Sequence, residues 1–189
     1  ASRGIGKEIA KQLSKNNPMI SHYVLDEGYV PLWVLVNVLT LGTISVFYQN
    51  MKQEDQNNMG KKFSMQPAEM KSILSILSVF RNQWAHDGRL YNIKAKKNNG
   101  QPNSIKTNRI HRELHIPMDT GNNPTCGKND LFAIVIIFKL ILSKASFNKF
   151  FFVLKKQITL LQKKLKTVDK KVVLLAMGFP DNWMNIKKI

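Results

Sequence analysis

Arg81, Asn82 and His86 carry side chains that could act together on a phosphodiester bond. His86 follows Arg81 with four residues between them, and the polar Asn82 comes directly after the arginine. Histidine has an ordinary pKa of about 6.5, so it can give or take a proton near neutral pH. The arginine guanidinium is permanently charged, and its planar donors match phosphate oxygens. Such a group could cleave RNA without a metal: His86 activates the 2′-OH, Arg81 stabilises the phosphorane charge and Asn82 orients the imidazole or a phosphate.

The spacing of these residues fits a helix. Asn82, His86 and Arg89 lie at positions i, i+4 and i+7, which places them along one polar face. Arg81 and His86 are about 140° apart around such a helix, so they share one site only at the helix end or through a second subunit. A structural alternative stays open, in which Arg81 forms a salt bridge and His86 interacts favourably with the helix C-terminus. The spacing Arg-x4-His is short and can also arise by chance.

Apolar periodicity predicts the elements that position this group, and it predicts an all-α fold with no convincing strand. Pro67 begins a helix with apolar residues at every third or fourth position, which runs into residues 81–92. The other predicted helices cover residues 1–17, 31–48, 131–142 and 146–169. The predicted connecting segments are 18–28, 49–66 and 94–130. The last is long for an ordered loop, so we expect it to be variable and partly mobile, with a short helical stretch near 105–114.

Two of these segments, 31–48 and 131–142, are almost continuously apolar. A membrane-spanning helix needs about 20 mostly apolar residues. The first segment is shorter and is interrupted by polar residues such as Asn37 and Thr40, and the second contains Lys139. We therefore predict no membrane span and place both segments in the core of a single helical domain.

The chain is strongly basic. Its 189 residues include 29 Lys and Arg but only 12 Asp and Glu, which gives a formal net charge of +17. A surplus of this size favours polyanionic partners such as RNA, DNA or an anionic membrane, without choosing among them. Lysines alternate with an apolar stripe along residues 146–169. The first interpretation of this helix is a solvated face, the second an RNA-binding surface and the third a membrane surface contact.

Cysteine and histidine positions give no sign of a metal or cofactor site. Cys126 is the single cysteine, which excludes an intramolecular disulfide and suits the reducing cytoplasm. We find no secretory signal at the N-terminus. His111 and His115 could grip a metal from one helical turn, but no third ligand is evident. For both histidines we predict a solvated or phosphate-contacting role.

The N-terminal sequence SRGIGKEIA is similar to the glycine turn of short-chain dehydrogenases, and Tyr48 and Lys52 have the spacing of the catalytic pair of that family. A dinucleotide site requires a strand before the glycines and a βαβ unit after them. Neither is predicted here, so we interpret this similarity as coincidence.

The sequence RNQWAHDGRLYN at residues 81–92 resembles the signature R-N-x-x-A-H-x-x-R-L-x-N of Abi-like (abortive infection) proteins, which is regarded as a HEPN-type motif. Three further stretches agree with the family in the same order. They are PLWVLVNVLTLGTIS at 31–45, DLFAIVIIFKLIL at 130–142 and MGFPDNWMNI at 177–186. The resemblance extends from about residue 20 to the end of the chain.

This resemblance implies a HEPN-like helical bundle and a metal-independent endoribonuclease that stops the growth of phage-infected bacteria. Arg81 and His86 match the defining pair of the motif, and Asn82 matches its polar second position. Arg89 and Asn92 match trailing positions that are structural or contact RNA. The partners that the resemblance implies are RNA, a second copy of the chain with its motif facing the first, and a phage-derived or antitoxin trigger.

Other positions near the motif add to these expectations. Tyr91 could stack on a base, Lys94 is expected to contact RNA, and Trp84 is expected to lie in the core. The sequence departs from the commoner pattern at Asp87, where a second histidine often stands, which argues against a two-histidine mechanism. The chain is also expected to lack part of the N-terminal helical region of the family. Two alternatives to a nuclease stay open: a non-catalytic RNA-binding module, and a protein-interaction component of a defence or toxin–antitoxin system.

Overall fold

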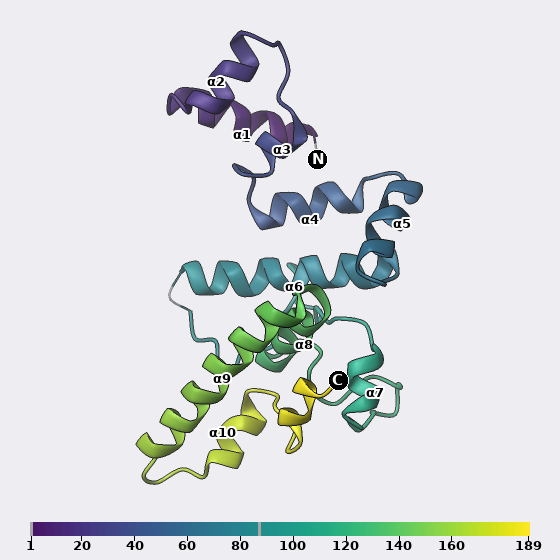
Figure 1. Ribbon diagram of the computed structural model, residues 1–189, viewed down its shortest axis with the longest axis vertical. Helices are drawn as coiled ribbons and strands as arrows, with labels where there is room; N and C mark the ends of the chain where they lie inside the picture. The colour runs from purple at the N-terminus through teal and green to yellow at the C-terminus, as the bar shows by residue number, and fades with distance from the viewer. Residues whose placement is uncertain (1, 87) are drawn as a thin grey trace.

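The computed structural model describes residues 2–86 and 88–189 and is built from helices (Figure 1). Over these two ranges it contains no strand, and the β-type pairing consists of two isolated bridges, Lys96 with Pro102 and Met118 with Pro124. The predicted all-α class is therefore confirmed. The interpretation given to Asp87 concerns a position outside the described residues.

The helices follow one another with short connections, apart from the segment between α6 and α8. The α-helices are α1 (Ser2–Ser14), α2 (Pro18–Leu25), α3 (Leu32–Leu35), α4 (Leu41–Gln49), α5 (Gln53–Lys62), α6 (Pro67–Ala85), α7 (Arg109–Glu113), α8 (Leu131–Ile141), α9 (Lys144–Lys164) and α10 (Lys170–Ala176). A 3₁₀ helix, η1 (Trp183–Lys187), follows near the end of the chain.

Helix α6 is the central element, and it begins where the sequence predicts. Pro67 occupies its first turn, where a missing N–H is no loss. The backbone N–H of Gln66 donates to the carboxylate of Glu69 at 2.8 Å, which completes a capping box. The buried residues of the helix recur at three- and four-residue intervals and are Met70, Ile73, Ile76 and Phe80.

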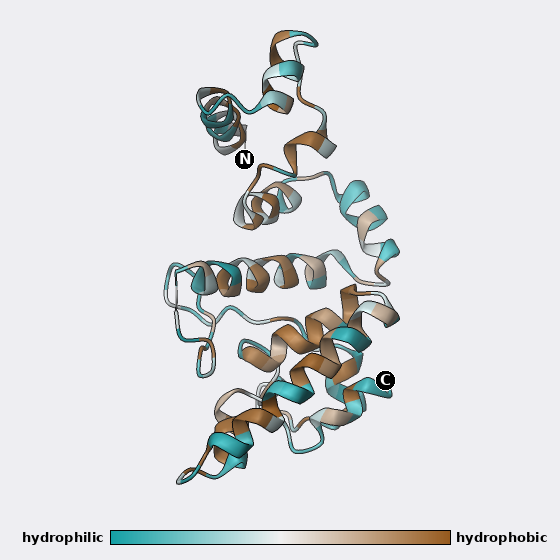
Figure 2. Ribbon diagram, turned by 60° about the vertical axis from the view of Figure 1, so that its left-hand side comes forward, coloured by the Kyte–Doolittle hydropathy of each residue, from teal (hydrophilic) through white to brown (hydrophobic). Residues whose placement is uncertain are grey.

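The helices form stacked layers around α6 (Figure 1). Helices α4 and α5 pack on one side of α6, while α8 packs on another side and is itself covered by α9. The main core extends from Tyr48 to Ile186. Helices α1–α3 form a further layer beyond α4, where Ile20 and Val34 are buried. Figure 2 shows that α8 is apolar along nearly all of its length, as expected for the most enclosed helix. No helix in the described ranges is long and apolar enough to cross a membrane.

Two expectations for the N-terminal part are wrong. The segment 18–28 was predicted as a connector, yet it contains α2, which Asn17 caps by accepting from the backbone N–H of Ile20 at 3.3 Å. The apolar segment 31–48 forms two helices, because the hydroxyl of Thr40 accepts from the backbone N–H of Thr43 at 3.1 Å and starts α4 there. Several apolar residues of this segment are also exposed, namely Leu32, Trp33, Val36 and Val46.

The two glycines of the dehydrogenase-like sequence lie inside α1.

The segment 49–66 was predicted as a loop, but it contains helix α5. The apolar pattern missed this helix because the residues on its buried face are not apolar. Gln56 is buried on this helix, and its amide Nε2 donates to the carbonyls of Tyr48 at 2.9 Å and Met51 at 3.0 Å. The Tyr48 hydroxyl donates in return to the carbonyl of Gln56 at 3.2 Å. The amide of Gln56 thus joins α4 to α5, and a hydrophobic pattern cannot reveal such a contact.

The segment 94–130 forms a long loop whose two ends meet. The backbone N–H of Ala95 donates to the carbonyl of Asn129 at 2.7 Å, so the two ends of the segment lie side by side. Between them the chain contains α7, at the place of the predicted helical stretch, and contributes buried residues to the core. These buried residues are Ala95, Ile105, Ile110, Leu114 and Ile116.

Candidate functional site at the C-terminal end of α6

Helix α6 ends abruptly beside the predicted catalytic residues. His86 is the C-terminal cap, and its backbone has left the helical conformation, with φ −111° and ψ 27°. The backbone N–H of Gly88 donates to the carbonyl of Gln83 at 2.8 Å, which turns the chain back on the helix. A Cβ atom at position 88 would meet the side chain of Gln83, which packs closely over this turn. His86 is thereby left at the open end of the helix.

The three residues predicted to be catalytic are all exposed at this helix end. Arg81 and Asn82 lie in the last turns of α6, and Nη1 of Arg81 donates to Oδ1 of Asn82 at 3.4 Å. This long contact is the one hydrogen bond recorded between members of the group. None of the side chains that the structure describes is hydrogen-bonded to the imidazole of His86. The group is therefore accessible to a large, charged substrate.

Trp84 does not lie in the core. Its side chain is 73% exposed, which contradicts the sequence-based expectation. The buried face of α6 ends at Phe80, so the last turn of the helix projects beyond the elements that pack against it. Helical periodicity continues through Trp84, but none of the elements that the structure describes buries this side chain. The result is a large exposed aromatic side chain close to Arg81 and His86 in the sequence.

The residues after the motif alternate between the core and solvent. Leu90 and Ile93 are partly buried and pack against the main core, which anchors this segment. Arg89, Tyr91 and Asn92 are exposed, with Tyr91 at 47%. Their side chains are available to a ligand, as the RNA-binding prediction requires, although that role stays a prediction.

Lys94 has a structural partner. Its ammonium lies 3.2 Å from the carboxylate of Asp130, whose side chain is 1% exposed. Asp130 also caps α8 by accepting from the backbone N–H of Ala133 at 3.1 Å, and it accepts from that of Gly127 at 3.1 Å. Burial, with Asp130 as a second cause, raises the pKa of Cys126 to about 11. This thiol stays protonated near neutral pH and is a poor nucleophile.

His111 is a buried structural residue, so the predicted solvated or phosphate-contacting role is wrong for it. The backbone N–H of Asn108 donates to Nδ1 of His111 at 3.2 Å, and Nε2 lies 3.0 Å from the carbonyl of Gly127. A carbonyl only accepts, so Nε2 carries the proton and the ring is neutral. His115 is exposed and has a positive φ of 50°. No cluster of three His, Cys, Asp or Glu side chains suited to a metal occurs in the part of the chain that the structure describes.

The burial of His111 predicts a pH dependence of stability. Burial lowers its pKa below the ordinary value of 6.5. As the pH falls, His111 therefore takes up a proton in the unfolded chain before it does so in the folded one. The contribution of His111 to stability is fully present above about pH 6.5 and decreases below it. The variant His111→Gln should be less stable at about pH 7.5, and the gap to the parent should narrow toward about pH 5. Urea unfolding across this range measures the effect, with His115→Asn as the control. If the free energy of unfolding changed with pH equally in the parent and in His111→Gln, the prediction would be contradicted.

Sequence reasoning did not anticipate a second group of polar residues, which lies around a hollow at the opposite end of α6. The basic members are Lys62, Lys106, Arg109, Arg112 and Lys139. They come from three segments that are far apart in the chain, and no local spacing connects them. The net charge was the one signal of their presence.

Comparison with known proteins supports part of the resemblance. No curated protein and no solved structure matches the chain. A family model described as "Abi-like protein" matches residues 2–92. The match includes α1 to α6 and every residue of the motif at 81–92, while the resembling stretches at 130–142 and 177–186 lie beyond it. This part of the chain is thus similar to Abi-like proteins.

Proposed function

We propose that this protein is a metal-independent endoribonuclease of a bacterial abortive-infection system. The observation that carries the proposal is the exposure of Arg81, Asn82 and His86 together at the end of α6, within the range matched by the family. The surrounding charge supports it as well, since Arg89 is exposed nearby and the whole chain carries +17. A positive surface raises the local concentration of a polyanionic substrate such as RNA.

The side chains supply the parts that RNA transesterification needs. His86 accepts the proton of a ribose 2′-OH, and the oxygen then attacks the adjacent phosphorus. The bond from phosphorus to the 5′-oxygen breaks, the leaving oxygen takes up a proton, and the products are a 2′,3′-cyclic phosphate and a 5′-OH end. A positioned acid or base contributes about 10²–10⁴-fold to such a step. Arg81 donates to the non-bridging oxygens as their negative charge grows, while Asn82 orients Arg81.

A homodimer completes the proposed site. One imidazole cannot serve at the same moment as base for the 2′-OH and acid for the leaving oxygen. A second copy with its own His86 supplies the other role, so the two histidines come from two chains and not from one motif. The 73% exposed Trp84 at this helix end offers apolar area for the contact. Activation by a phage-derived component or release from an antitoxin would then control when the dimer cuts RNA.

The proposal is tested by incubating the purified protein with total RNA in EDTA. We expect cleavage that leaves 2′,3′-cyclic phosphate ends, because the 2′-OH is the nucleophile and no metal takes part. The ends are identified by ligation with an enzyme that accepts cyclic phosphates, before and after their removal. A His86→Ala preparation purified in the same way controls for contaminating nucleases. If neither preparation cuts RNA but both bind it, the protein is a non-catalytic RNA-binding module instead.

A further inference from the structure

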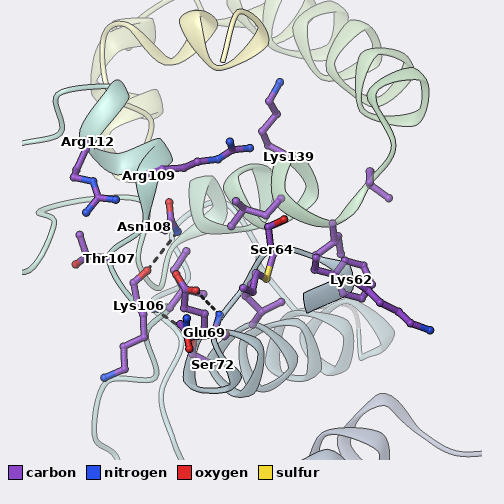
Figure 3. Close-up of a pocket in the computed structure, with 18 of the residues that line it drawn as sticks. Lys62, Ser64, Glu69, Ser72, Lys106, Thr107, Asn108, Arg109, Arg112 and Lys139 are labelled. Atoms are coloured by element: carbon purple, nitrogen blue, oxygen red, sulfur yellow. Dashed lines mark hydrogen bonds between the residues drawn. The ribbon is translucent and has the colours of Figure 1, made fainter. Parts of the chain in front are cut away.

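A basic hollow lies at the N-terminal end of α6, opposite the candidate catalytic residues. Its volume is about 820 Å³, and it is enclosed by the start of α6, the segment around α7 and the junction between α8 and α9. Five cationic side chains line it: Lys62, Lys106, Arg109, Arg112 and Lys139. In Figure 3 the side chain of Arg109 extends toward Lys139, with Arg112 and Lys62 on opposite sides of the view.

The positive charge of this hollow is not balanced by the protein. Glu69 is the one acidic residue in its lining, and its carboxylate already accepts from the backbone N–H of Gln66 at 2.8 Å. None of the ion pairs formed among the described residues includes any of the five cations. Burial, and then the charges of Arg109 and Lys144, lower the pKa of Lys139, while Glu113 acts in the opposite direction. A bound anion would relieve this repulsion.

Two long helices also direct their N-terminal ends at the hollow. Gln66 caps α6 and Ser143 caps α9, which contain 19 and 21 residues, and both caps line the hollow. The N-terminal end of a helix carries a partial positive charge that favours anions. The exposed hydroxyls of Ser64 and Thr107 add donors to the lining, and Phe63, which is 39% exposed, offers an aromatic face beside them. Phosphate groups next to a stacked base fit this combination of charge and ring.

The hollow and the motif are placed to contact one strand at separate points. Glu69 and His86 are separated by 17 positions along α6, a distance of about 26 Å at 1.5 Å per residue. About eight stacked nucleotides at about 3.4 Å each cover that distance. The basic side chains near the two ends of α6 can thus hold a strand without competing for the same phosphate.

We propose that the basic hollow is an anchoring site for the phosphates of a single RNA strand, distinct from the residues that cut it. The inference rests on the proposed function in that it takes RNA as the substrate. Free polyphosphates present the same chemistry, so the experiment must separate the two sources.

The experiment measures RNA binding in a background that cannot cut. With His86→Ala in every protein, Lys106→Gln/Arg109→Gln/Arg112→Gln removes three exposed cations of the hollow. The matched control, Arg3→Gln/Lys7→Gln/Lys15→Gln, removes three exposed cations of the N-terminal part of the chain, and both triple variants lower the formal charge from +17 to +14. A fluorescent single-stranded RNA of about 20 nucleotides is titrated by anisotropy at several salt concentrations. The hollow variant should bind about tenfold more weakly near 0.1 M salt, with a salt slope smaller by about two, while the control changes little.

Two results would overturn the inference. One is equal weakening in the two triple variants, which would mean that the RNA responds to net charge alone. The other is a loss of inorganic triphosphate binding in the hollow variant, measured by calorimetry, while the RNA affinity of the two triple variants stays equal. The hollow would then hold a small polyphosphate and not RNA. Circular dichroism checks that the variants are folded. Cleavage is scored separately, so a protein that fails to cut but binds RNA through the hollow disproves the nuclease and leaves the anchoring site intact.

Discussion

Replacing His86 with alanine is expected to reduce RNA cleavage by about 10²–10⁴-fold, because the substitution removes the proposed general base. Replacing Arg81 with alanine should cost about 10²–10³-fold, since it removes a donor to the developing charge on phosphorus. Both side chains are exposed, and neither is bonded to a buried residue among those that the structure describes, so the thermal midpoint should stay close to that of the parent. Initial rates on a labelled RNA in EDTA measure these effects.

Two controls sharpen this prediction. Arg81→Lys keeps the charge but loses the planar pair of donors, so it should restore activity only in part if bidentate phosphate contact matters. His115→Asn removes another exposed histidine outside the motif and should leave the rate unchanged, because asparagine tolerates the positive φ of 50° at that position. Parent-like cutting by His86→Ala would exclude His86 from the reaction.

Gly178→Ala is expected to lower the free energy of unfolding by about 2–5 kcal/mol, the sum of a backbone and a packing cost. Gly178 has a φ of +83°, which residues with a Cβ rarely adopt. A Cβ at this position would also overlap the carboxyl group of Asp130. That carboxyl cannot easily move, because it caps α8 and pairs with Lys94.

Gly100 offers a matched control, because its φ of +80° is nearly the same but a Cβ there would meet nothing within 4 Å. Gly100→Ala should therefore show the backbone cost alone, about 1–2 kcal/mol. Urea unfolding with linear extrapolation compares the two variants with the parent. Equal losses at both glycines would show that the contact with Asp130 has no energetic weight.

The parts of the fold that sequence predicted well are those in which apolar periodicity coincides with burial. Helix α6 is the best example, since its buried residues and its Pro67 start both follow from spacing. Prediction failed where a buried polar side chain joins two helices or where a polar side chain caps a helix. Gln56 makes α5 part of the core through its amide, and the hydroxyl of Thr40 divides an apolar segment that reads as one helix.

The candidate site was predicted only in part, because contacts with distant elements decide where several of its side chains lie. Spacing predicted Asn82, His86 and Arg89 on one helical face, but α6 ends at Ala85, so His86 caps the helix and Arg89 lies beyond it. Spacing could not show that Trp84 projects beyond the core or that Lys94 pairs with Asp130, since each depends on where distant elements end. The basic hollow was missed entirely, because Lys62, Arg109 and Lys139 meet only in the folded chain.

The joined ends of the segment 94–130 have a consequence for how the chain can change in evolution. The hydrogen bond from Ala95 to Asn129 and the ion pair from Lys94 to Asp130 close this segment at its base. Residues added at a tip, such as the turn at Gly100, then lengthen a loop whose ends are already fixed. Each doubling of such a loop costs only about 0.6 kcal/mol in closure entropy. Insertions and deletions can accumulate there while α6 and α8 keep their positions.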